Sequence, residues 1–298
     1  MRSKLLFFQI QVLSLQSEIQ AKEFVMIFFP NCKINLGLSI VAKRDDGFHE
    51  IKSVFYPVDL CDSLEIRPSD EAESRFELTG LDIGESNSED NLCMKALRLL
   101  QKDYPQIGNV NMHLHKTIPA FAGLGGGSSD AVSTLRLLDF LYSLSLSKDE
   151  LLKYATSLGS DCAFFVENSP MYVSGRGERM QKSNLSLKGK SVVLVKPDIK
   201  ISTKEAYGRV CPKPSVINYK RLPELNRWKE ELKNDFEDSL FPLYPLLGEI
   251  KQMLYDNGAI YASLSGSGAT VYGIFEKEID LERINAGKNT FVWQGVLR

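Results

Sequence analysis

A run of glycines between two regular segments constrains this chain more than any other feature. Residues 123–129 read GLGGGSS, after an alternating strand-like stretch at 110–115 and before apolar residues at helical spacing in 131–142. Because glycine lacks a Cβ, such a backbone can turn tightly and approach a ligand closely. The free N–H groups and the dipole at the start of a helix favour an anion. The pattern predicts a cradle for a polyphosphate.

Two commoner phosphate loops do not fit this run. A dinucleotide-binding fingerprint would need glycine where Ser128 stands. A Walker A loop would need glycine where Asn184 precedes the Gly-Lys-Ser of residues 189–191. A flexible surface loop is the remaining alternative, but such loops seldom join a strand directly to a well-formed helix.

Composition and charge set the general class. The chain has 298 residues, 43% hydrophobic and 25% charged, which is typical of a globular protein with room for two domains. A net charge of -2 gives no electrostatic reason to expect nucleic acid or an anionic membrane as a partner. Five cysteines without a CxxC pair fit a reducing cytosol, so we expect a cytoplasmic protein.

The first 25 residues superficially resemble a secretion signal. Arg2 and Lys4 precede a short apolar run, but glutamines interrupt it and no small-residue cleavage site follows. No stretch of the chain has the apolar length that spans a bilayer. We interpret residues 1–25 as an N-terminal extension and Met26 as a plausible start.

Apolar periodicity predicts mixed strands and helices from Met26 onward. Strands are expected at residues 27–29, 34–41, 54–60, 63–67, 76–79, 110–115, 191–195, 259–264 and 270–275. Helices are expected at residues 91–103, 131–142, 147–159, 224–236 and 246–256, the third opened by a capping box at 147–150. We place a domain boundary in the polar stretch 181–190, which gives domains at 26–185 and 186–298.

Two further patterns leave alternatives open. His113 and His115 share a strand face and could form a metal pair, but no third ligand of suitable spacing is visible, which favours a solvated face. Residues 263–270 (SLSGSGAT) could approach a phosphate, and a hairpin turn explains them equally well. Their spacing differs from a nucleophile elbow, and three histidines give a serine triad little support.

Several motifs together resemble the GHMP kinases, a superfamily of small-molecule kinases. Residues 30–36, 123–131 and 265–270 are similar to its first, second and third signature motifs, in the family's order. Residues 46–49, 89–92 and 158–162 narrow the resemblance to the branch that acts on a cytidylated methylerythritol. The resemblance extends from Met26 to about Phe275.

This resemblance implies a two-domain α+β fold. An N-terminal domain of ribosomal-protein-like type would carry the first two motifs, a ferredoxin-like C-terminal domain would carry the third, and the site would lie between them. The implied reaction transfers the γ-phosphoryl group of ATP to a hydroxyl of the small-molecule substrate, in the non-mevalonate route to isoprenoid precursors. Mg²⁺ is expected with ATP; its protein ligands are not assigned, and Ser128 and Ser129 are the candidates.

The resemblance also implies two catalytic residues. Asp161 matches the catalytic base and Lys33 the lysine that pairs with it. A positioned carboxylate can accept the proton that an attacking hydroxyl must lose. A nearby ammonium keeps that carboxylate ionised and offsets charge at the reaction centre. The alternative for each residue is an ordinary surface charge.

Two sets of binding residues follow from the same match. The expected cytidine-recognition positions are Asn35, Phe48, His49 and Tyr207, which supply rings to stack on a pyrimidine and groups to read its edge. The expected nucleotide-binding positions are Asn91, Lys116, Pro119, Ala120, Phe121, Ala122, Gly123, Leu124, Gly125, Gly126, Gly127, Ser128, Ser129 and Asp130. As isolated residues, these would more often be core aromatics or surface polar groups.

The chain departs from the family pattern at three places. Phe121 stands where small residues are usual, Asn31-Cys32 replaces a small apolar pair, and no proline follows Asp161. The rivals are a GHMP kinase acting on homoserine, mevalonate or a sugar, a non-catalytic ligand-binding homologue, and a nucleic-acid-binding module. The sequence leaves the oligomeric state open.

Overall fold

The computed structural model describes residues 26–84 and 88–298. Two compact units make up the fold, and each combines separate stretches of the chain. Unit 1 contains Cys61–Ile118 and Gly126–Val166 with the chain up to Asn31, and unit 2 contains Cys32–Leu60, Pro119–Gly125 and Glu167–Arg298. The chain therefore passes from one unit to the other inside the glycine run. The interpreted extension 1–25 lies outside the described residues, and the boundary near residue 185 stays a prediction.

Unit 1 is built on a four-stranded sheet with the order β1-β4-β6-β5. Its strands are β1 (Met26–Phe28), β4 (Ser63–Ser69), β5 (Arg75–Gly80) and β6 (Asn109–Lys116). β4 runs antiparallel to β1 and β6, whereas β5 runs parallel to β6. A parallel pair needs a crossover connection, and α1 (Leu92–Asp103), preceded by the short helix η1 (Ser88–Asp90), supplies it.

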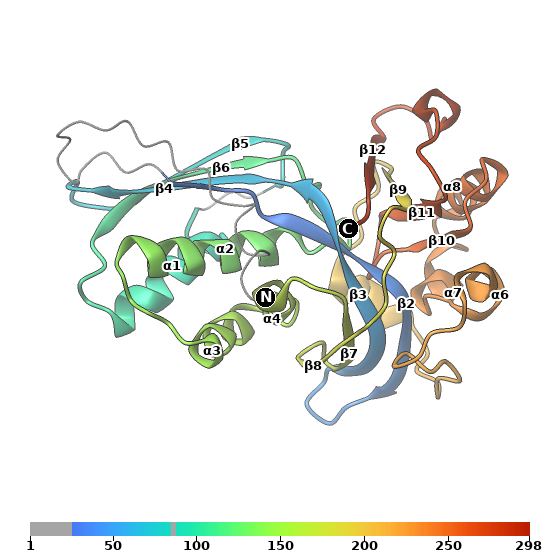
Figure 1. Ribbon diagram of the computed structural model, residues 1–298, viewed down its shortest axis with the longest axis horizontal. Helices are drawn as coiled ribbons and strands as arrows, with labels where there is room; N and C mark the ends of the chain where they lie inside the picture. Colours follow the sequence, from blue (N-terminus) through green and yellow to red (C-terminus); the bar gives the residue numbers. More distant parts are fainter. Residues whose placement is uncertain (1–25, 85–87) are drawn as a thin grey trace, which may run out of the picture. The chain divides into compact units, whose positions relative to one another are not determined.

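Helices α1 and α2 (Gly126–Leu141) pack together along one face of this sheet (Figure 1). The predicted helix at 91–103 is confirmed, with Asn91 as its N-cap. The predicted capping box is also confirmed at α3 (Lys148–Leu158), and α4 (Cys162–Glu167) follows it. Helix α2 begins at Gly126 rather than at residue 131, so the second half of the glycine run is already helical.

The first sheet of unit 2 has the order β2-β3-β7-β8. Its strands are β2 (Asn31–Lys43), β3 (His49–Cys61), β7 (Met171–Gly175) and β8 (Arg179–Lys182). Strand β2 begins earlier than the predicted 34–41, and its first ten residues are buried. Lys33 and Asn35 are therefore buried strand residues, held by the regular structure on which the site depends.

The second sheet of unit 2 is antiparallel, with the order β10-β11-β9-β12. Its strands are β9 (Ser191–Lys196), β10 (Tyr261–Leu264), β11 (Val271–Phe275) and β12 (Phe291–Val296). Helix α8 (Pro245–Asp256) packs on β10 and β11, and its Leu254 shares a core with Val193 and Val271. This is the expected ferredoxin-like order, with η3 (Leu281–Arg283) in place of the second helix.

The continuous helix predicted at 224–236 is wrong. The segment forms η2 (Leu225–Arg227) and α6 (Trp228–Glu231), becomes extended, and then continues as α7 (Phe236–Leu240); α5 (Thr203–Arg209) lies upstream. The extended residues bond to β2 instead of to a helix. Leu38 N–H donates to Lys233 O at 2.9 Å, and Asp235 N–H donates to Leu38 O at 2.8 Å. Tertiary hydrogen bonds override local helix propensity here.

None of the helices within residues 26–84 and 88–298 is both long enough and apolar enough to cross a bilayer.

Candidate active site

In unit 2 the first motif and the glycine run meet at Lys33. Its side chain is buried, with 2% of the residue exposed. The ammonium donates to Asn35 Oδ1 at 2.7 Å and to Gly123 O at 3.1 Å, and it lies 4.6 Å from the centre of the Phe55 ring. Its backbone N–H donates to Leu124 O at 2.9 Å. Strand β2 and the glycine run are thus joined through both the backbone and the side chain of one residue.

Asn35 is held so that its oxygen faces this lysine. Its Nδ2 donates to Ser53 Oγ at 3.1 Å, and its backbone carbonyl accepts the Tyr272 hydroxyl at 2.6 Å. With both ends of the amide engaged, Asn35 orients the Lys33 ammonium. The structure therefore brings Asn35 to the predicted lysine, and its predicted part in cytidine recognition stays a prediction.

The third motif forms the turn between β10 and β11, and this turn packs against the glycine run. Ser265 Oγ donates to Gly123 O at 2.9 Å. Ala269 N–H donates to Phe121 O at 3.0 Å and Thr270 N–H to Ala122 O at 3.3 Å. The segment is therefore the hairpin turn that the sequence left open, and its contacts support the loop that carries Gly123.

Residue 123 must be glycine for the turn of the third motif to pack against it. Its φ is +69°, in the left-handed region that side chains rarely adopt, and a Cβ there would overlap the carbonyl oxygen of Ser265. Two separate effects, backbone strain and backbone collision, therefore exclude a side chain at this one residue.

Gly123→Ala should destabilise the protein by about 3 kcal/mol, because overpacking costs about 1 to 3 kcal/mol and left-handed strain about 1 to 2 kcal/mol. Urea unfolding of the purified variant measures this loss. The matched control is Gly189→Ala, because Gly189 has φ +84° but, in the described part of the chain, nothing within 4 Å of an added Cβ. Equal losses in the two variants would show that the contact with Ser265 does not matter.

In unit 1 a buried ion triad stands just before the glycine run. Lys116 is 4% exposed, and its ammonium pairs with the carboxylates of Asp62 and Asp130. The distance from Lys116 Nζ to Asp130 Oδ2 is 2.6 Å. Asp62 Oδ1 also accepts the backbone N–H groups of Thr117 at 2.6 Å and Ile118 at 2.8 Å. The triad thereby ties the end of β6 and the chain leaving it to helix α2.

Burial and the two carboxylates have opposite effects on the pKa of Lys116. Burial by itself lowers the pKa of Lys116, but the charges of Asp130 and Asp62 outweigh it, so the pKa is raised and the lysine is charged. Burial, together with the charge of Asp62, raises the pKa of Asp130 to about 7 against the effect of Lys116. Among the described residues Asp130 Oδ1 is buried without a hydrogen-bond partner.

The first turn of α2 is shaped to receive an anion. It comprises Gly126, Gly127, Ser128 and Ser129 and contains no acidic residue. A Cβ on Gly126 would lie 2.9 Å from a methyl carbon of Ile118 and 3.4 Å from Lys116 Nζ. Gly127 is exposed, and among the residues that the structure describes only the Leu92 side chain lies within 4 Å of the place of its missing Cβ. The backbone can therefore be approached closely, which fits a phosphate of ATP.

Asn91, another predicted nucleotide residue, caps the helix beside this turn. Its Oδ1 accepts the N–H of Cys93 at 2.8 Å at the start of α1. Because the next residue, Leu92, faces Gly127, unit 1 places Asn91 near the start of α2. Asn91, Lys116, Asp130 and the first turn of α2 therefore lie in one neighbourhood. Nucleotide binding by these residues remains a prediction.

Asp161 lies half-buried in the turn that precedes α4. Its neighbour Cys162 is buried, and burial raises the pKa of that thiol to about 12, while a hydrogen bond with the Ser128 side chain acts in the opposite direction. The Ser128 contact places this turn beside the start of α2. Asp161 belongs to unit 1 and Lys33 to unit 2, so their pairing stays a prediction.

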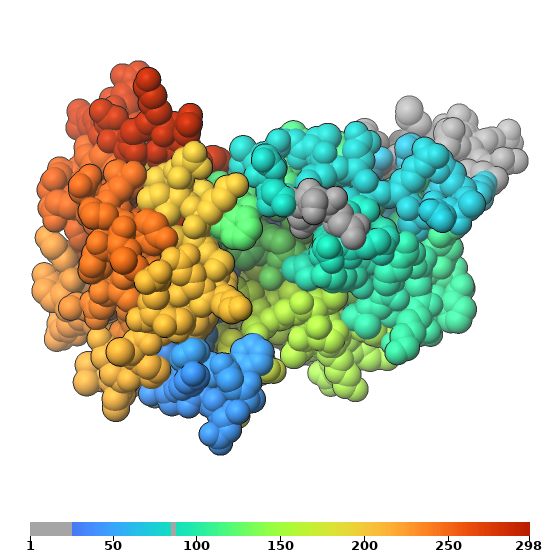
Figure 2. Space-filling view, turned by 180° about the vertical axis from the view of Figure 1, so that it is seen from behind, coloured from blue at the N-terminus to red at the C-terminus, as the bar shows by residue number. Residues whose placement is uncertain are grey.

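The predicted cytidine residues lie in unit 2, around the connection between β2 and β3. His49 stacks on Tyr207 with ring centres 4.9 Å apart, and Tyr207 meets Phe236 edge-on at 4.9 Å. Phe48 is 50% exposed and lies under the Arg176 guanidinium, 4.6 Å from its ring centre. In the space-filling view this connection (blue) lies beside the yellow segment that contains α5 (Figure 2). Three of the four predicted residues therefore lie at or next to this connection.

His49 is suited to read a hydrogen-bonding edge at neutral pH. Burial, and to a lesser extent the charge of Lys43, lowers the pKa of its imidazole below the ordinary value of 6.5. A neutral imidazole offers one donor and one acceptor. The ring therefore presents both functions at once.

The side chains of His113 and His115 both contact Thr79. His113 Nε2 lies 2.8 Å and His115 Nδ1 lies 2.9 Å from the hydroxyl of Thr79 on β5. In the described part of the chain no group of three or more histidine, cysteine or acidic side chains is arranged to hold a metal. The contacts with Thr79 fit the interpretation of these histidines as polar residues of a strand face.

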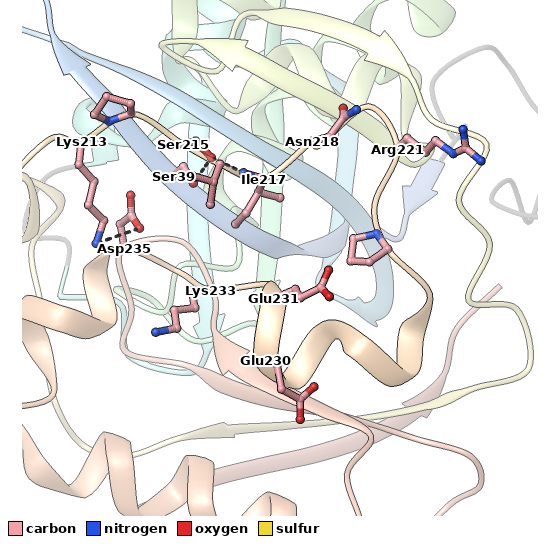
Figure 3. Close-up of a pocket in the computed structure, with 13 residues that line it drawn as sticks. Ser39, Lys213, Ser215, Ile217, Asn218, Arg221, Glu230, Glu231, Lys233 and Asp235 are labelled. Atoms are coloured by element: carbon pink, nitrogen blue, oxygen red, sulfur yellow. Dashed lines mark hydrogen bonds and ion pairs between the residues drawn. The ribbon is translucent and has the colours of Figure 1, made fainter.

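A separate cavity of about 660 Å³ lies in unit 2 between β2 and the segment after α5 (Figure 3). Ser39 forms its β2 side and bonds the Ser215 hydroxyl at 2.9 Å. Lys213, Lys233 and Asp235 also line it. None of the residues predicted from the sequence to bind a ligand lines this cavity.

The sequence did not reveal Asp62 or Asn234. Asp62 is a single acidic residue between two strands, and Asn234 lies in a segment with helical periodicity. Neither belongs to a spacing pattern that indicates chemistry. Asp62 could have been found only by asking which acidic residue neutralises Lys116. The sequence held no signal that could have pointed to Asn234.

Comparison with known proteins agrees with these motifs. Residues 91–169 match the model of the GHMP kinases N terminal domain, and residues 217–286 match that of the GHMP kinases C terminal. A 4-diphosphocytidyl-2-C-methyl-D-erythritol kinase of Bacteroides thetaiotaomicron is 50% identical over 276 residues, covering 91% of this chain and 100% of the relative. One from Parabacteroides distasonis is 44% identical over 275 residues, with the same coverage of both chains.

A solved structure shows the same likeness in three dimensions. The crystal structure of a 4-(cytidine 5'-diphospho)-2C-methyl-D-erythritol kinase superposes with a TM-score of 0.77 at 30% identity, covering 91% of this chain and 99% of the other. The expected two-domain α+β fold is confirmed. The chain belongs to the GHMP kinases and, within them, to the family of 4-diphosphocytidyl-2-C-methyl-D-erythritol kinases.

Proposed function

We propose that this chain transfers the γ-phosphoryl group of ATP to a hydroxyl of 4-diphosphocytidyl-2-C-methyl-D-erythritol, a step in the non-mevalonate route to isoprenoid precursors. The observation that carries this proposal is the buried Lys33 ammonium, held on Gly123 O and Asn35 Oδ1 at the edge of the glycine run. A buried cation fixed beside a phosphate-binding backbone suits phosphoryl transfer. Likeness to kinases of this name over 91% of the chain supports this substrate.

Asp161 is the base in this proposal. Its carboxylate takes the proton of the acceptor hydroxyl as the new O–P bond forms, and the bond between the γ-phosphorus and the ADP oxygen breaks. The Lys33 ammonium offsets the negative charge that builds up at the transferred group. The first turn of α2, which has no acidic residue, holds phosphate oxygens on its free N–H groups.

Mg²⁺ accompanies ATP in this proposal and neutralises charge on the phosphate oxygens. The half-buried Ser128 and the buried Ser129 lie in the turn that would hold those phosphates, and either hydroxyl suits a hard cation. The cytidine ring is assigned to His49, Tyr207 and Phe48, whose rings offer stacking surface and whose imidazole reads the base edge.

A substrate panel tests the proposal. The purified full chain is mixed with ATP and Mg²⁺, and ADP release is followed with the cytidylated methylerythritol, homoserine, mevalonate or galactose as acceptor. Turnover is expected with the first acceptor alone, and mass spectrometry should show one added phosphoryl group on it. Turnover on a different acceptor, with none on the cytidylated one, would overturn the assignment and select another GHMP kinase activity.

A further inference from the structure

The extended segment between α6 and α7 places one asparagine at the centre of the third motif. Asn234 is 1% exposed. Its Nδ2 donates to Leu264 O and to Gly266 O, both at 2.8 Å, and its Oδ1 accepts the N–H of Phe236 at 3.0 Å. Both amide hydrogens and the amide oxygen are therefore used within the protein. The side chain joins the start of α7 to two carbonyls of the turn after β10.

The same segment is attached to strand β2 by its backbone. Leu38 pairs with Asn234 as an isolated parallel bridge, and the Ile40 N–H donates to Asp235 Oδ2 at 2.8 Å. Lys233 and Asp235 line the cavity beside β2, and these neighbours of Asn234 are drawn there in Figure 3. Residues 233–235 thus bond to the strand that carries Lys33 on one side and to the third motif on the other.

Gly266, which Asn234 holds, lies against both groups that orient Lys33. A Cβ on Gly266 would be 3.1 Å from Gly123 O and 3.4 Å from Asn35 Oδ1. These two oxygens are the acceptors of the Lys33 ammonium. A shift of the Gly266 backbone would therefore displace or release the acceptors that set the direction of the lysine.

We propose that Asn234 is a positioning residue for phosphoryl transfer: by fixing the carbonyls of Leu264 and Gly266 it holds the turn that sets the acceptors of Lys33. This inference rests on the proposed function, in which Lys33 acts at the reaction centre. Asparagine suits the position because one amide supplies two donors to two carbonyls and an acceptor to a helix start. An ionised aspartate would present an oxygen, in place of a donor, to both carbonyls.

A second anchor lets the role of Asn234 be separated from folding. Glu237 Oε1 accepts the Ser263 hydroxyl and the Leu264 N–H, both at 2.9 Å, and so holds β10 independently of Asn234. Ser263→Ala removes one of these bonds and weakens the same strand. It leaves the Asn234 bonds to Leu264 O and Gly266 O in place. This variant measures the effect of loosening β10 alone.

The test compares Asn234→Ala and the isosteric Asn234→Asp with Ser263→Ala and Asn257→Asp. Asn257 Nδ2 donates to a backbone carbonyl too, that of Met253 at 2.9 Å at the end of α8, away from the glycine run. Both Asn234 variants should lose about 10- to 100-fold in kcat, because small displacements of catalytic groups have effects of that size. KM for the cytidylated substrate should change less than kcat, because the predicted stacking rings of Phe48 and His49 lie at or next to the connection between β2 and β3. The two controls should keep kcat within about 2-fold of wild type, since their substitutions leave the catalytic geometry in place.

Hydrogen exchange supplies a readout independent of turnover. The N–H groups of Ala269 and Thr270 bond to Phe121 O and Ala122 O, so they report whether the turn still holds the glycine run. Their exchange should accelerate in both Asn234 variants and stay near wild type in Ser263→Ala. Wild-type activity on the cytidylated substrate is measured in parallel, because its absence would refute the proposed function and not this inference.

Two outcomes would overturn the inference. One is an Asn234→Asp enzyme with wild-type kcat and unchanged exchange at Ala269 and Thr270. The other is an equal fall of kcat in Ser263→Ala and the Asn234 variants, which would assign the effect to general loosening of β10. If Asn234→Ala does not fold, the Asp variant, which keeps the shape of the side chain, decides between these outcomes.

Discussion

Asp161→Asn is expected to lower kcat by about 10³-fold, the middle of the range for removal of a general base. The amide has nearly the shape of the carboxylate but cannot accept the proton of the attacking hydroxyl. The loss should therefore appear in kcat, with KM for ATP and for the cytidylated substrate little changed. Steady-state kinetics at saturating ATP and Mg²⁺ measure both parameters.

The matched control for this substitution is Asp103→Asn in the same unit. Asp103 is the last residue of α1 and accepts the Tyr154 hydroxyl at 2.7 Å on an exposed surface. Its variant loses the same charge but should keep wild-type kcat. An Asp161→Asn enzyme that retains more than about a tenth of wild-type kcat would remove Asp161 from the role of base.

Lys116→Met is expected to reduce the free energy of unfolding by about 3 to 5 kcal/mol, as removal of one partner of a buried ion pair does. Methionine keeps much of the length and apolar character of the side chain but removes the charge. Asp62 and Asp130 would remain buried with the cation between them gone. Urea unfolding at pH 8 measures the loss.

The comparison for this variant is Lys190→Met. Lys190 also pairs with a carboxylate, Glu276, but that partner is 68% exposed, and such surface pairs contribute about 1 kcal/mol or less. A second check uses pH. Because the pKa of Asp130 is raised in the folded protein, acidification towards pH 5 protonates that carboxyl, and the deficit of Lys116→Met should shrink. Equal losses in the two lysine variants at pH 8 would contradict the structural role given to the triad.

The third motif forms the hairpin turn that was one of the two alternatives its sequence left open. A serine- and glycine-rich segment can approach a phosphate, but here Ser265 Oγ and the N–H groups of Ala269 and Thr270 bond to the backbone of residues 121–123. The turn thus supports the glycine run. In this protein the glycines of the second and third motifs allow two backbones to pack closely, as the collision predicted for Gly123→Ala illustrates.

Local physics was enough to predict the elements whose signals are short in range. The Ser147 and Glu150 capping box starts α3, because both its hydrogen bonds lie within four residues. Alternating polarity predicted β6, and Asn91 was placed at the helix start that it caps. Family motifs are contiguous in sequence. They were therefore enough to single out the glycine run, Lys33 and Asp161 as candidate site residues.

The sequence by itself determined strands β1 to β6 and β9 to β11, helices α1, α2, α3 and α8, the family and the residues that carry the proposed chemistry. Only the tertiary structure decided that Asp62 neutralises Lys116 and that Asn234 leaves a helical pattern to bond the turn at Leu264 and Gly266. The physical reason is range: a buried charge or amide must find its partner wherever folding brings one. These partners lie tens of residues away, where no local periodicity reports them.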